Sequence, residues 1–166
     1  MENMSGGLAR GAGSFSTDLP DLNMDGDNID LNQFVAFSIG DQQYCVDIMQ
    51  VREIRAWDGA TALPNSADYI RGVINLRGHI VPVIDLRTRF GQGTTDTTKG
   101  AVIVIVMIEE KLHGLLVDAV SDILSVKPDA VADAPSTASD SGLLAGIITH
   151  DEQMVAIIEL NRLAVE

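Results

Sequence analysis

The feature that most constrains the fold of this chain is an internal duplication of short apolar runs. When the first half is shifted by 69 positions, Phe37, Ile39, Val46, Ile48, Val51, Glu53 and Ile54 superpose on Val106, Ile108, Leu115, Val117, Val120, Asp122 and Ile123. A shift of 74 positions superposes residues 72–74 and 83–86 on residues 146–148 and 157–160. Because self-similarity at a fixed spacing indicates repeated structural units, we predict two repeats of roughly 65 residues.

Each repeat is expected to consist of short β-strands. Runs of apolar residues bounded by turn residues predict strands at Gln33–Ile39, Tyr44–Ile48, Val51–Arg55, Gly72–Leu76 and Ile80–Asp85. The turns Gly40-Asp41-Gln42 and Arg77-Gly78 lie between neighbouring strands and predict two hairpins. Leu86–Phe90 is predicted to form one helical turn, and the apolar spacing within Ile48–Ile54 also fits a helical turn running into a strand.

The repeats predict an all-β domain of two small barrels. A small sheet exposes its edges unless it closes, and a unit of this size is marginally stable alone, so the barrels should pack together and leave a groove between them. Residues 1–32 are rich in Gly, Ser, Asp and Asn, carry −5 of the net charge of −13, and are predicted to be a disordered acidic tail before a domain at 33–166. Lys127–Leu143 is predicted to be a long surface loop.

Charge and hydropathy exclude several classes of protein. A net charge of −13 opposes binding to nucleic acid or to an anionic membrane surface, since both require a basic patch. The single cysteine, Cys45, rules out an intrachain disulfide and a Cys-rich metal site, and it fits a reducing compartment. The longest strongly apolar run, Ala101–Ile108, is too short to span a membrane, and residues 1–19 show no signal-peptide pattern. We therefore expect a cytosolic protein.

The sequence shows no constellation typical of catalysis or metal binding. His79, His113 and His150 lie at or beside predicted hairpin turns and are expected to be surface turn residues. Cys45 lies among apolar residues and is expected to pack as a small hydrophobic side chain. Residues 21–27 match the first half of an EF-hand calcium loop, but Asn32 stands where a bidentate Glu is needed, so a solvated acidic tail is the better interpretation. Neither a cofactor nor a metal is predicted.

Two charged residues stand out on this predicted scaffold. Glu53 lies within a predicted strand, and Arg77 lies at the tip of the second hairpin. The simplest interpretation is a solvent-facing strand residue and a solvated turn residue, because isolated surface charges contribute little. Arginine is nevertheless a preferred anchor in protein interfaces.

Several segments resemble the CheW family. The resemblance is carried by Tyr69–Arg87, by Phe34–Ile39 with the Gly40-Asp41 turn, by Val51–Arg55 and by Gly114–Leu124, and it extends over 33–166. It implies two intertwined, pseudo-repeated five-stranded SH3-like barrels and no catalysis. It also implies a cytoplasmic adaptor, recruited to membrane-associated chemoreceptor arrays, that couples the cytoplasmic tips of methyl-accepting chemotaxis receptors to the regulatory domain of the histidine kinase CheA.

The resemblance further implies a receptor-contacting groove between the barrels and a pairing of Glu53 with Arg77. Its positions fall on Val51, Glu53, Ile54, Arg77, Val102 and Ile123. The apolar positions would supply affinity for an amphipathic helix, and the ion pair would supply orientation. Two alternatives are an excised regulatory domain of a larger kinase and an enzymatic or small-ligand-binding barrel. The aromatic content of 4% and the lack of convergent polar residues disfavour a shaped ligand pocket.

Overall fold

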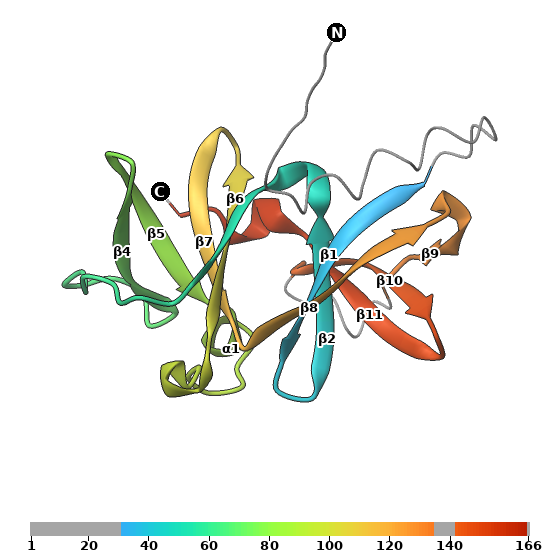
Figure 1. Ribbon diagram of the computed structural model, residues 1–166, viewed down its shortest axis with the longest axis horizontal. Coiled ribbons are helices and arrows are strands. Elements are labelled where there is room, and N and C mark those ends of the chain that lie inside the picture. The colour runs from blue at the N-terminus through green and yellow to red at the C-terminus, as the bar shows by residue number, and fades with distance from the viewer. Residues whose placement is uncertain (1–30, 135–141, 166) are drawn as a thin grey trace, which may run out of the picture. The chain divides into compact units, whose positions relative to one another are not determined.

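A computed structural model describes residues 31–134 and 142–165, which form short strands with only single helical turns between them (Figure 1). The strands are β1 Asn32–Ile39, β2 Gln42–Asp47, β3 Val51–Ala56, β4 Ile70–Leu76, β5 His79–Asp85, β6 Val102–Ile108, β7 Lys111–Val117, β8 Ala119–Val126, β9 Val131–Ala132, β10 Leu144–His150 and β11 Gln153–Ile158. The helical turns are α1 Leu86–Arg89 and the 3-10 turns η3 Ile48–Gln50, η4 Thr97–Lys99, η5 Pro128–Ala130 and η6 Leu160–Leu163. No helix in the described ranges is long and apolar enough to cross a membrane.

The predicted strands, both hairpins and the helical turn after β5 are confirmed, with boundaries that differ by at most two residues. Residues 1–30 of the predicted disordered tail lie outside the described residues, and Asn32, at the end of the predicted tail, belongs to β1. The long loop predicted at Lys127–Leu143 is wrong in part, because η5 and the short strand β9 lie within it and β9 pairs with β10. Residues 135–141 of that segment are outside the described residues.

The duplication is visible in the details of the strands. β4 and β10 begin and end 74 positions apart, as do α1 and η6. Two β-bulges are also equivalent. Arg52 is the extra residue where β3 pairs with β6, and Ser121, 69 positions later, is the extra residue where β8 pairs with β1. A bulge sets local bend and twist, so its presence at the same place in both halves supports a repeat of structure as well as of composition.

The third strand of each repeat crosses to the hairpin of the other repeat. Sheet A has the strand order β8-β1-β2-β11-β10-β9, and sheet B has the order β3-β6-β7-β5-β4. β3 thus leaves the β1–β2 hairpin and pairs with β6, while β8 leaves the β6–β7 hairpin and pairs with β1. The two sheets are therefore interleaved, as the resemblance implied, and neither is built from one repeat alone. Sheet B has the expected five strands, and β9 adds a sixth to sheet A.

Three apolar clusters fill this arrangement. One lies within each sheet, and a third, the inter-sheet core, joins the two sheets through Val35, Phe37, Ile39, Tyr44, Val46, Ile84, Leu86, Val104, Val106, Ile108, Leu115, Val117, Leu143, Ile158, Leu160 and Leu163. The central strands β1, β2, β6 and β7 bury both faces, because one face points into their own sheet and the other into the inter-sheet core. Two-sided burial explains why Ala101–Ile108 is apolar without alternation.

Cys45 is fully buried within sheet A, as predicted, and burial raises the pKa of its thiol to about 12. The thiol is therefore protonated and unreactive at neutral pH. Its equivalent in the other repeat is Gly114, where an added Cβ would lie 2.9 Å from Cγ2 of Ile103. The two halves thus pack their interiors with different side chains on the same backbone plan.

A buried carboxylate holds the end of the β4–β5 hairpin against the loop that follows α1. Asp85 is 1% exposed and caps α1 by accepting from the backbone N–H of Arg87. It also accepts from Nη1 of Arg71 at 2.8 Å and from Oγ1 and N of Thr95 at 2.6 and 3.0 Å. Removing Asp85 would leave Arg71 and the buried Thr95 without their shared acceptor, so the loss of this side chain should be strongly destabilising.

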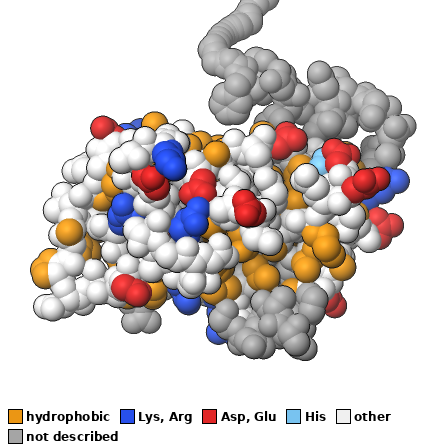
Figure 2. Space-filling model, turned by 90° about the horizontal axis from the view of Figure 1, so that it is seen from below, with side chains coloured by type: hydrophobic (Ala, Val, Ile, Leu, Met, Phe, Trp, Pro, Cys, Tyr) orange, Lys and Arg blue, Asp and Glu red, His pale blue; other side chains and the backbone are white. Residues whose placement is uncertain are grey.

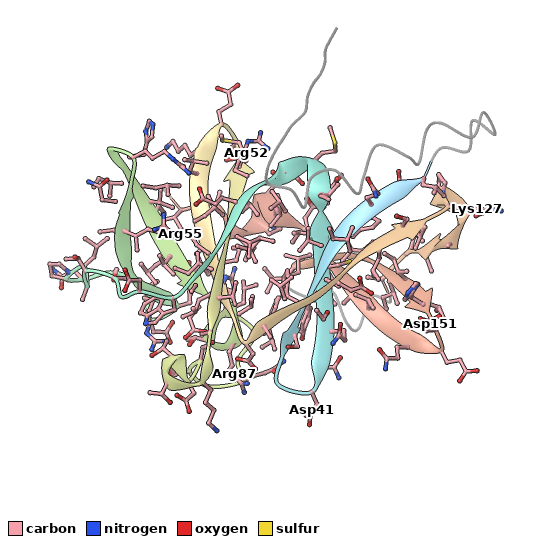
Figure 3. The ribbon with its side chains drawn as sticks, viewed as in Figure 1. Asp41, Arg52, Arg55, Arg87, Lys127 and Asp151 are labelled. Carbon is pink, nitrogen blue, oxygen red and sulfur yellow. The ribbon has the colours of Figure 1, made fainter. Side chains whose placement is uncertain are left out.

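A second set of polar contacts joins the two sheets at the lower end of the molecule in Figure 3, where Arg87 is labelled. Nη2 of Arg87 donates to Oδ2 of Asp118 at 2.7 Å, and the backbone N–H of Gly40 donates to the same oxygen at 2.8 Å. Asp118 therefore links the α1 turn, the β1–β2 hairpin and the junction of β7 with β8.

His79 is exposed, as expected for a surface turn residue, but the same expectation for His113 is wrong, because its side chain is buried. The imidazole of His113 is 1% exposed, its Nδ1 lies 3.1 Å from the carbonyl oxygen of Lys111, and its Nε2 accepts from the backbone N–H of Val165 at 3.1 Å. The prediction failed because β7 is buried on both faces from His113 onward, and the C-terminal residues cover the His113 side chain. This geometry fits a neutral ring with the proton on Nδ1, and burial lowers the pKa of His113.

We predict that Asp85→Ala lowers the free energy of unfolding by about 3 kcal/mol or more, because Arg71 and Thr95 lose their shared acceptor. The matched control is Glu159→Ala at the equivalent position in the other repeat, where Glu159 makes no side-chain capping bond to η6. Urea denaturation of both variants measures the difference. Equal, small losses in the two variants would show that the Asp85 network is not a stabilising element.

The depressed pKa of His113 predicts acid sensitivity. Because the folded pKa lies below the unfolded value near 6.5, the unfolded chain binds more protons in the interval between them. Stability should be complete above about pH 6.5 and fall as the pH is lowered, by at most about 1.4 kcal/mol per pH unit from this group. His113→Gln should flatten this slope in urea denaturation, with His79→Gln as the control. A slope unchanged in His113→Gln would contradict the assignment.

Candidate functional site

The ion pair predicted between Glu53 and Arg77 is present. Nη2 of Arg77 donates to Oε1 of Glu53 at 2.8 Å. Arg77 and Gly78 both have positive φ, 52° and 88°, as the two-residue turn that favours a right-twisted hairpin requires. β4 and β3 are the two edge strands of sheet B, and the turn at the end of β4 holds the side chain of Arg77 against Glu53 of β3. The pair therefore joins the two edge strands through side chains.

The solvent exposure of this pair limits its contribution to stability. The side chain of Arg77 is 71% exposed and that of Glu53 is 28% exposed. Exposed ion pairs typically contribute about 1 kcal/mol or less to folding. Nη1 of Arg55 lies 4.0 Å from the second carboxylate oxygen of Glu53, so the carboxylate is approached by two guanidinium groups. Arg52 and Arg55 both extend from β3 (Figure 3).

The bulges determine which face of each crossing strand the apolar residues occupy. Val51 pairs with Val106 and Ile54 pairs with Val104, and both partners belong to the inter-sheet core. Residues directly opposite each other in an antiparallel pair share one face of the sheet. Val51 and Ile54 therefore share that face although they are three positions apart, because Arg52 is the extra residue. This spacing is the one that also resembled a helical turn, and the helical turn itself is confined to η3.

The same geometry recurs on β8 and reaches β6. Ile123 pairs with Val35, another inter-sheet residue, and Val102 pairs with Ala56 and packs partly against the same core. The structure thus places four of the six predicted residues on faces directed toward the inter-sheet core, and we call Val51, Ile54, Val102 and Ile123 the crossing-strand face. Ile54 is 45% exposed and Ile123 is 38% exposed, so both aliphatic side chains are accessible to a partner.

Glu53 lies on the other face of β3, because it pairs with Ile105 of the sheet B core. The predicted six residues therefore do not form one continuous lining. The crossing-strand face and the ion pair lie on opposite faces of the edge strand β3, which has a ladder partner, β6, on one side only. A partner that contacts both must extend around the free edge of β3.

Sequence reasoning missed two features beside this site. Met49 in η3, two positions before Val51, is 77% exposed, and its carbonyl oxygen accepts from Nη1 of Arg52 at 2.9 Å. A hollow of about 420 Å³ lies beside the ion pair and is lined by Arg52, Glu53, Leu76, Arg77, His79, Met107 and Leu112. The repeated three-residue spacing of Val51 with Ile54 and of Val120 with Ile123 was the sequence signal for the bulges that create this environment.

The electrostatic character of the surface is mixed. Figure 2 shows acidic and basic side chains interspersed on the face seen from below, without a single large basic area. Among the described residues, no group of three or more His, Cys, Asp or Glu side chains is placed to hold a metal ion. The segment that resembled half a calcium loop, residues 21–27, lies outside the described residues.

Comparisons with known proteins agree with the fold. The model of the CheW-like domain family matches residues 33–166. A probable chemotaxis protein CheW of Rhizobium etli is 47% identical over 133 residues, which is 79% of this chain and 86% of the relative. The chemotaxis protein CheW of Klebsiella aerogenes is 35% identical over 133 residues, or 79% and 80% of the two chains.

A solved structure is similar over the same region. The scaffolding protein TtCheW of Thermoanaerobacter tengcongensis superposes with a TM-score of 0.75 and 35% sequence identity, covering 78% of this chain and 90% of that one. The interleaved sheets, the family match over the whole described domain and the identity to relatives together lead to one conclusion. This chain belongs to the CheW family.

Proposed function

We propose that this protein is a non-enzymatic adaptor that couples methyl-accepting chemotaxis receptors to the histidine kinase CheA in bacterial chemotaxis. The observation that carries the proposal is the crossing-strand face together with the Glu53–Arg77 pair around the edge strand β3. The names of the relatives support a role in chemotaxis, and the name of the superposed structure supports scaffolding. The proposed place of action is the cytoplasm, at the receptor tips.

The crossing-strand face has the chemistry to receive an amphipathic receptor helix. Ile54 and Ile123 present exposed aliphatic surface, which an apolar helix stripe would remove from water. Burying each such side chain contributes on the order of 1 kcal/mol or more to affinity, because its exposed apolar surface is removed from water. The apolar contact alone does not fix the direction of the helix.

The ion pair supplies that missing specificity in our proposal. Arg77 is largely exposed and held by a single hydrogen bond to Glu53, so it can exchange or share that bond with a partner carboxylate. Charges at the rim of an interface act mainly on orientation, association rate and rejection of wrong partners. The pair therefore functions as an oriented polar contact beside an apolar one.

Coupling further requires that the kinase and the receptor bind at the same time. We propose that the regulatory domain of CheA uses a surface separate from the crossing-strand face, because two ligands of one site would compete and could not be linked through a shared conformational equilibrium. The role needs no catalysis. Two partly buried ion pairs, Arg71 with Asp85 and Arg87 with Asp118, are engaged in hydrogen bonds that hold the fold together.

We predict that Arg77→Glu reduces receptor-stimulated CheA autophosphorylation about tenfold in reconstituted receptor membranes, because a carboxylate then faces Glu53 and repels the partner. The fold should be retained, since Arg77 is exposed. Lys99→Glu is the matched control, because it makes the same charge change at an 81% exposed side chain in η4, away from β3. An equal loss in Lys99→Glu would attribute the effect to net charge rather than to this site.

The reversed pair tests the contact itself. Glu53→Arg alone should also impair coupling, and the double variant with Arg77→Glu should recover part of the lost activity, because the ion pair is restored with its charges exchanged. A double-mutant cycle in the same kinase assay measures the coupling energy. Simple addition of the two defects would show that Glu53 and Arg77 act independently.

A further inference from the structure

The two edge strands of sheet B, β3 and β4, face each other across a seam that two sets of hydrogen bonds hold together. At one end, Thr61 and Val73 exchange backbone hydrogen bonds, each at 2.8 Å. At the other end, the side chain of Arg77 reaches Glu53. Between these two ties lies a hollow of about 380 Å³, which residues of both strands line. Along the hollow, β3 and β4 do not pair with each other.

The free edge of β3 carries backbone groups that have no ladder partner. The backbone N–H of Trp57 donates to the carbonyl oxygen of Ala101 at 3.0 Å, which continues the ladder between β3 and β6. In an antiparallel ladder, residues that bond to the neighbouring strand alternate with residues that do not. Trp57 and Arg55 are thus bonded to β6, whereas Ile54 and Ala56 direct their N–H and carbonyl groups toward the seam.

The edge of β4 on the other side of the hollow is unpaired as well. Val73 bonds to Thr61 on this side of the strand, so Asn75, two positions later, also directs its N–H and carbonyl groups toward the seam. None of the backbone hydrogen bonds outside the ladders of the described strands reaches Ile54, Ala56 or Asn75. Free donors and acceptors along a strand edge are a template for a further strand.

The other repeat has an equivalent of this seam, where β9 pairs with β10. Ile147 lies 74 positions after Val73 and pairs with Ala132, as Val73 pairs with Thr61. The residue before Ile147 and the residue before Val73 are both glycines. An added Cβ at these glycines would lie 2.8 Å from the carbonyl oxygen of Ala132 and 2.5 Å from that of Thr61. Thr61 is therefore the structural equivalent of Ala132.

The residues that precede this equivalent pair differ in size. Val131 precedes Ala132 and packs against the buried cluster of sheet A. Ala60 precedes Thr61 and lines the hollow in sheet B, together with Ile74 and Ile103 of the sheet B core. A methyl group thus stands where the other repeat has a branched aliphatic side chain. The apolar floor of the hollow is left partly open as a result.

An added strand that pairs with β3 in the antiparallel direction directs a side chain into this space. Two alternate residues of the strand bond to Ile54 and Ala56, and the residue between them lies opposite Arg55. Arg55 itself pairs with Ile103, and directly opposed residues share one face of a sheet. The side chain between the two bonded residues therefore points toward Ile103 and the sheet B core.

We propose that the seam between β3 and β4 binds an extended segment of a protein partner, which adds to β3 as an antiparallel strand and inserts a branched aliphatic side chain toward Ile74 and Ile103. The unpaired backbone groups select an extended chain, as in other cases of strand addition. The difference between Val131 and Ala60 selects the aliphatic side chain. The inference goes beyond the proposed function, because it stands on the geometry of sheet B and on the comparison of the repeats.

The test uses the full chain and the peptide acetyl-Ser-Thr-Val-Thr-Ser-amide, whose two Thr residues pair with Ile54 and Ala56 while its Val enters the hollow. Amide correlation spectra should give a dissociation constant in the millimolar range, as expected for a short ligand that is ordered on binding. At a peptide concentration of about ten times this constant, the amides of Ile54, Ala56 and Asn75 should exchange with solvent about tenfold more slowly, because the bound state protects them.

Two control peptides separate the backbone contacts from the side-chain contact. Acetyl-Ser-Thr-Gly-Thr-Ser-amide lacks the aliphatic side chain and should bind about tenfold more weakly. The Val peptide with both Thr nitrogens methylated cannot donate to β3, so it should not slow amide exchange at the seam. Equal binding and equal protection with all three peptides would overturn the proposal.

Variants of the protein locate the binding site. Ala60→Val supplies from within the chain the side chain that Val131 provides in the other repeat, and it should weaken binding of the Val peptide about tenfold. Ala130→Val, at an exposed position in η5, is the matched control and should bind as the wild type does. Ala56→Pro removes a donor from the free edge of β3 and should also weaken binding. An edge strand tolerates a proline whose missing N–H faces away from its neighbour, so the fold should be retained.

The proposal is overturned if the Val peptide binds without slowing exchange at Ile54 and Ala56, or if Ala60→Val and Ala56→Pro both bind it as the wild type does. Because peptide binding to the isolated protein needs neither receptor nor kinase, the result is independent of the proposed function. A protein that couples receptor to kinase but does not bind the Val peptide would keep the proposed function and lose the strand-binding seam.

Discussion

The exchange of β3 and β8 between the repeats is the constraint on which the rest of this structure depends. Each strand leaves its own hairpin and completes the sheet of the other repeat, so neither half can fold its five strands from its own chain segment. The exchange places β1, β2, β6 and β7 back to back across the inter-sheet core, where Phe37, Ile108 and Leu115 are fully buried. Two units that would be marginal alone become one cooperative domain.

The same exchange creates the proposed functional surface. A crossing strand must turn from one sheet to the other, and the bulges at Arg52 and Ser121 provide the local bend. Each bulge shifts the alternation by one residue, which keeps Val51 with Ile54, and Val120 with Ile123, on the inter-sheet side. The most exposed of these residues, Ile54 and Ile123, lie on the edge strands, where partner contact is sterically open.

Pseudo-symmetry fixes the common plan, and substitutions between the repeats give each half its own chemistry. Asp85 caps α1 and binds Arg71, whereas its equivalent Glu159 forms no capping bond. Arg77 pairs with Glu53, whereas the equivalent positions in the second repeat are Asp151 and Asp122, two acidic residues that cannot form such an ion pair. The ion pair and the hollow between β3 and β4 both belong to sheet B. The two repeats thus share a backbone plan but differ in their side-chain contacts.

Much of the fold was predictable because it is local. The hairpins follow from turn residues between apolar runs, and the duplication follows from spacing. The residues themselves did not reveal the strand exchange, because β3 would pair with equal hydrogen bonding in its own sheet, and only the family resemblance implied interleaving. The burial of His113 was missed because a polar residue beside a turn carries no signal of the C-terminal segment that covers it. The Glu53–Arg77 pair was predicted through resemblance, whereas the bulge at Arg52, which puts Glu53 and Val51 on opposite faces of β3, was not predicted.

The most direct test of the account is to label the isoleucine methyl groups and follow Ile54 and Ile123 while a soluble cytoplasmic fragment of a chemoreceptor is added. Both resonances should shift together and saturably if the two crossing strands form one partner-binding surface, as proposed. Ile103 and Ile105, in the sheet B core, should move little. Binding of the fragment without a change at Ile54 and Ile123 would contradict the central claim and place the receptor contact elsewhere.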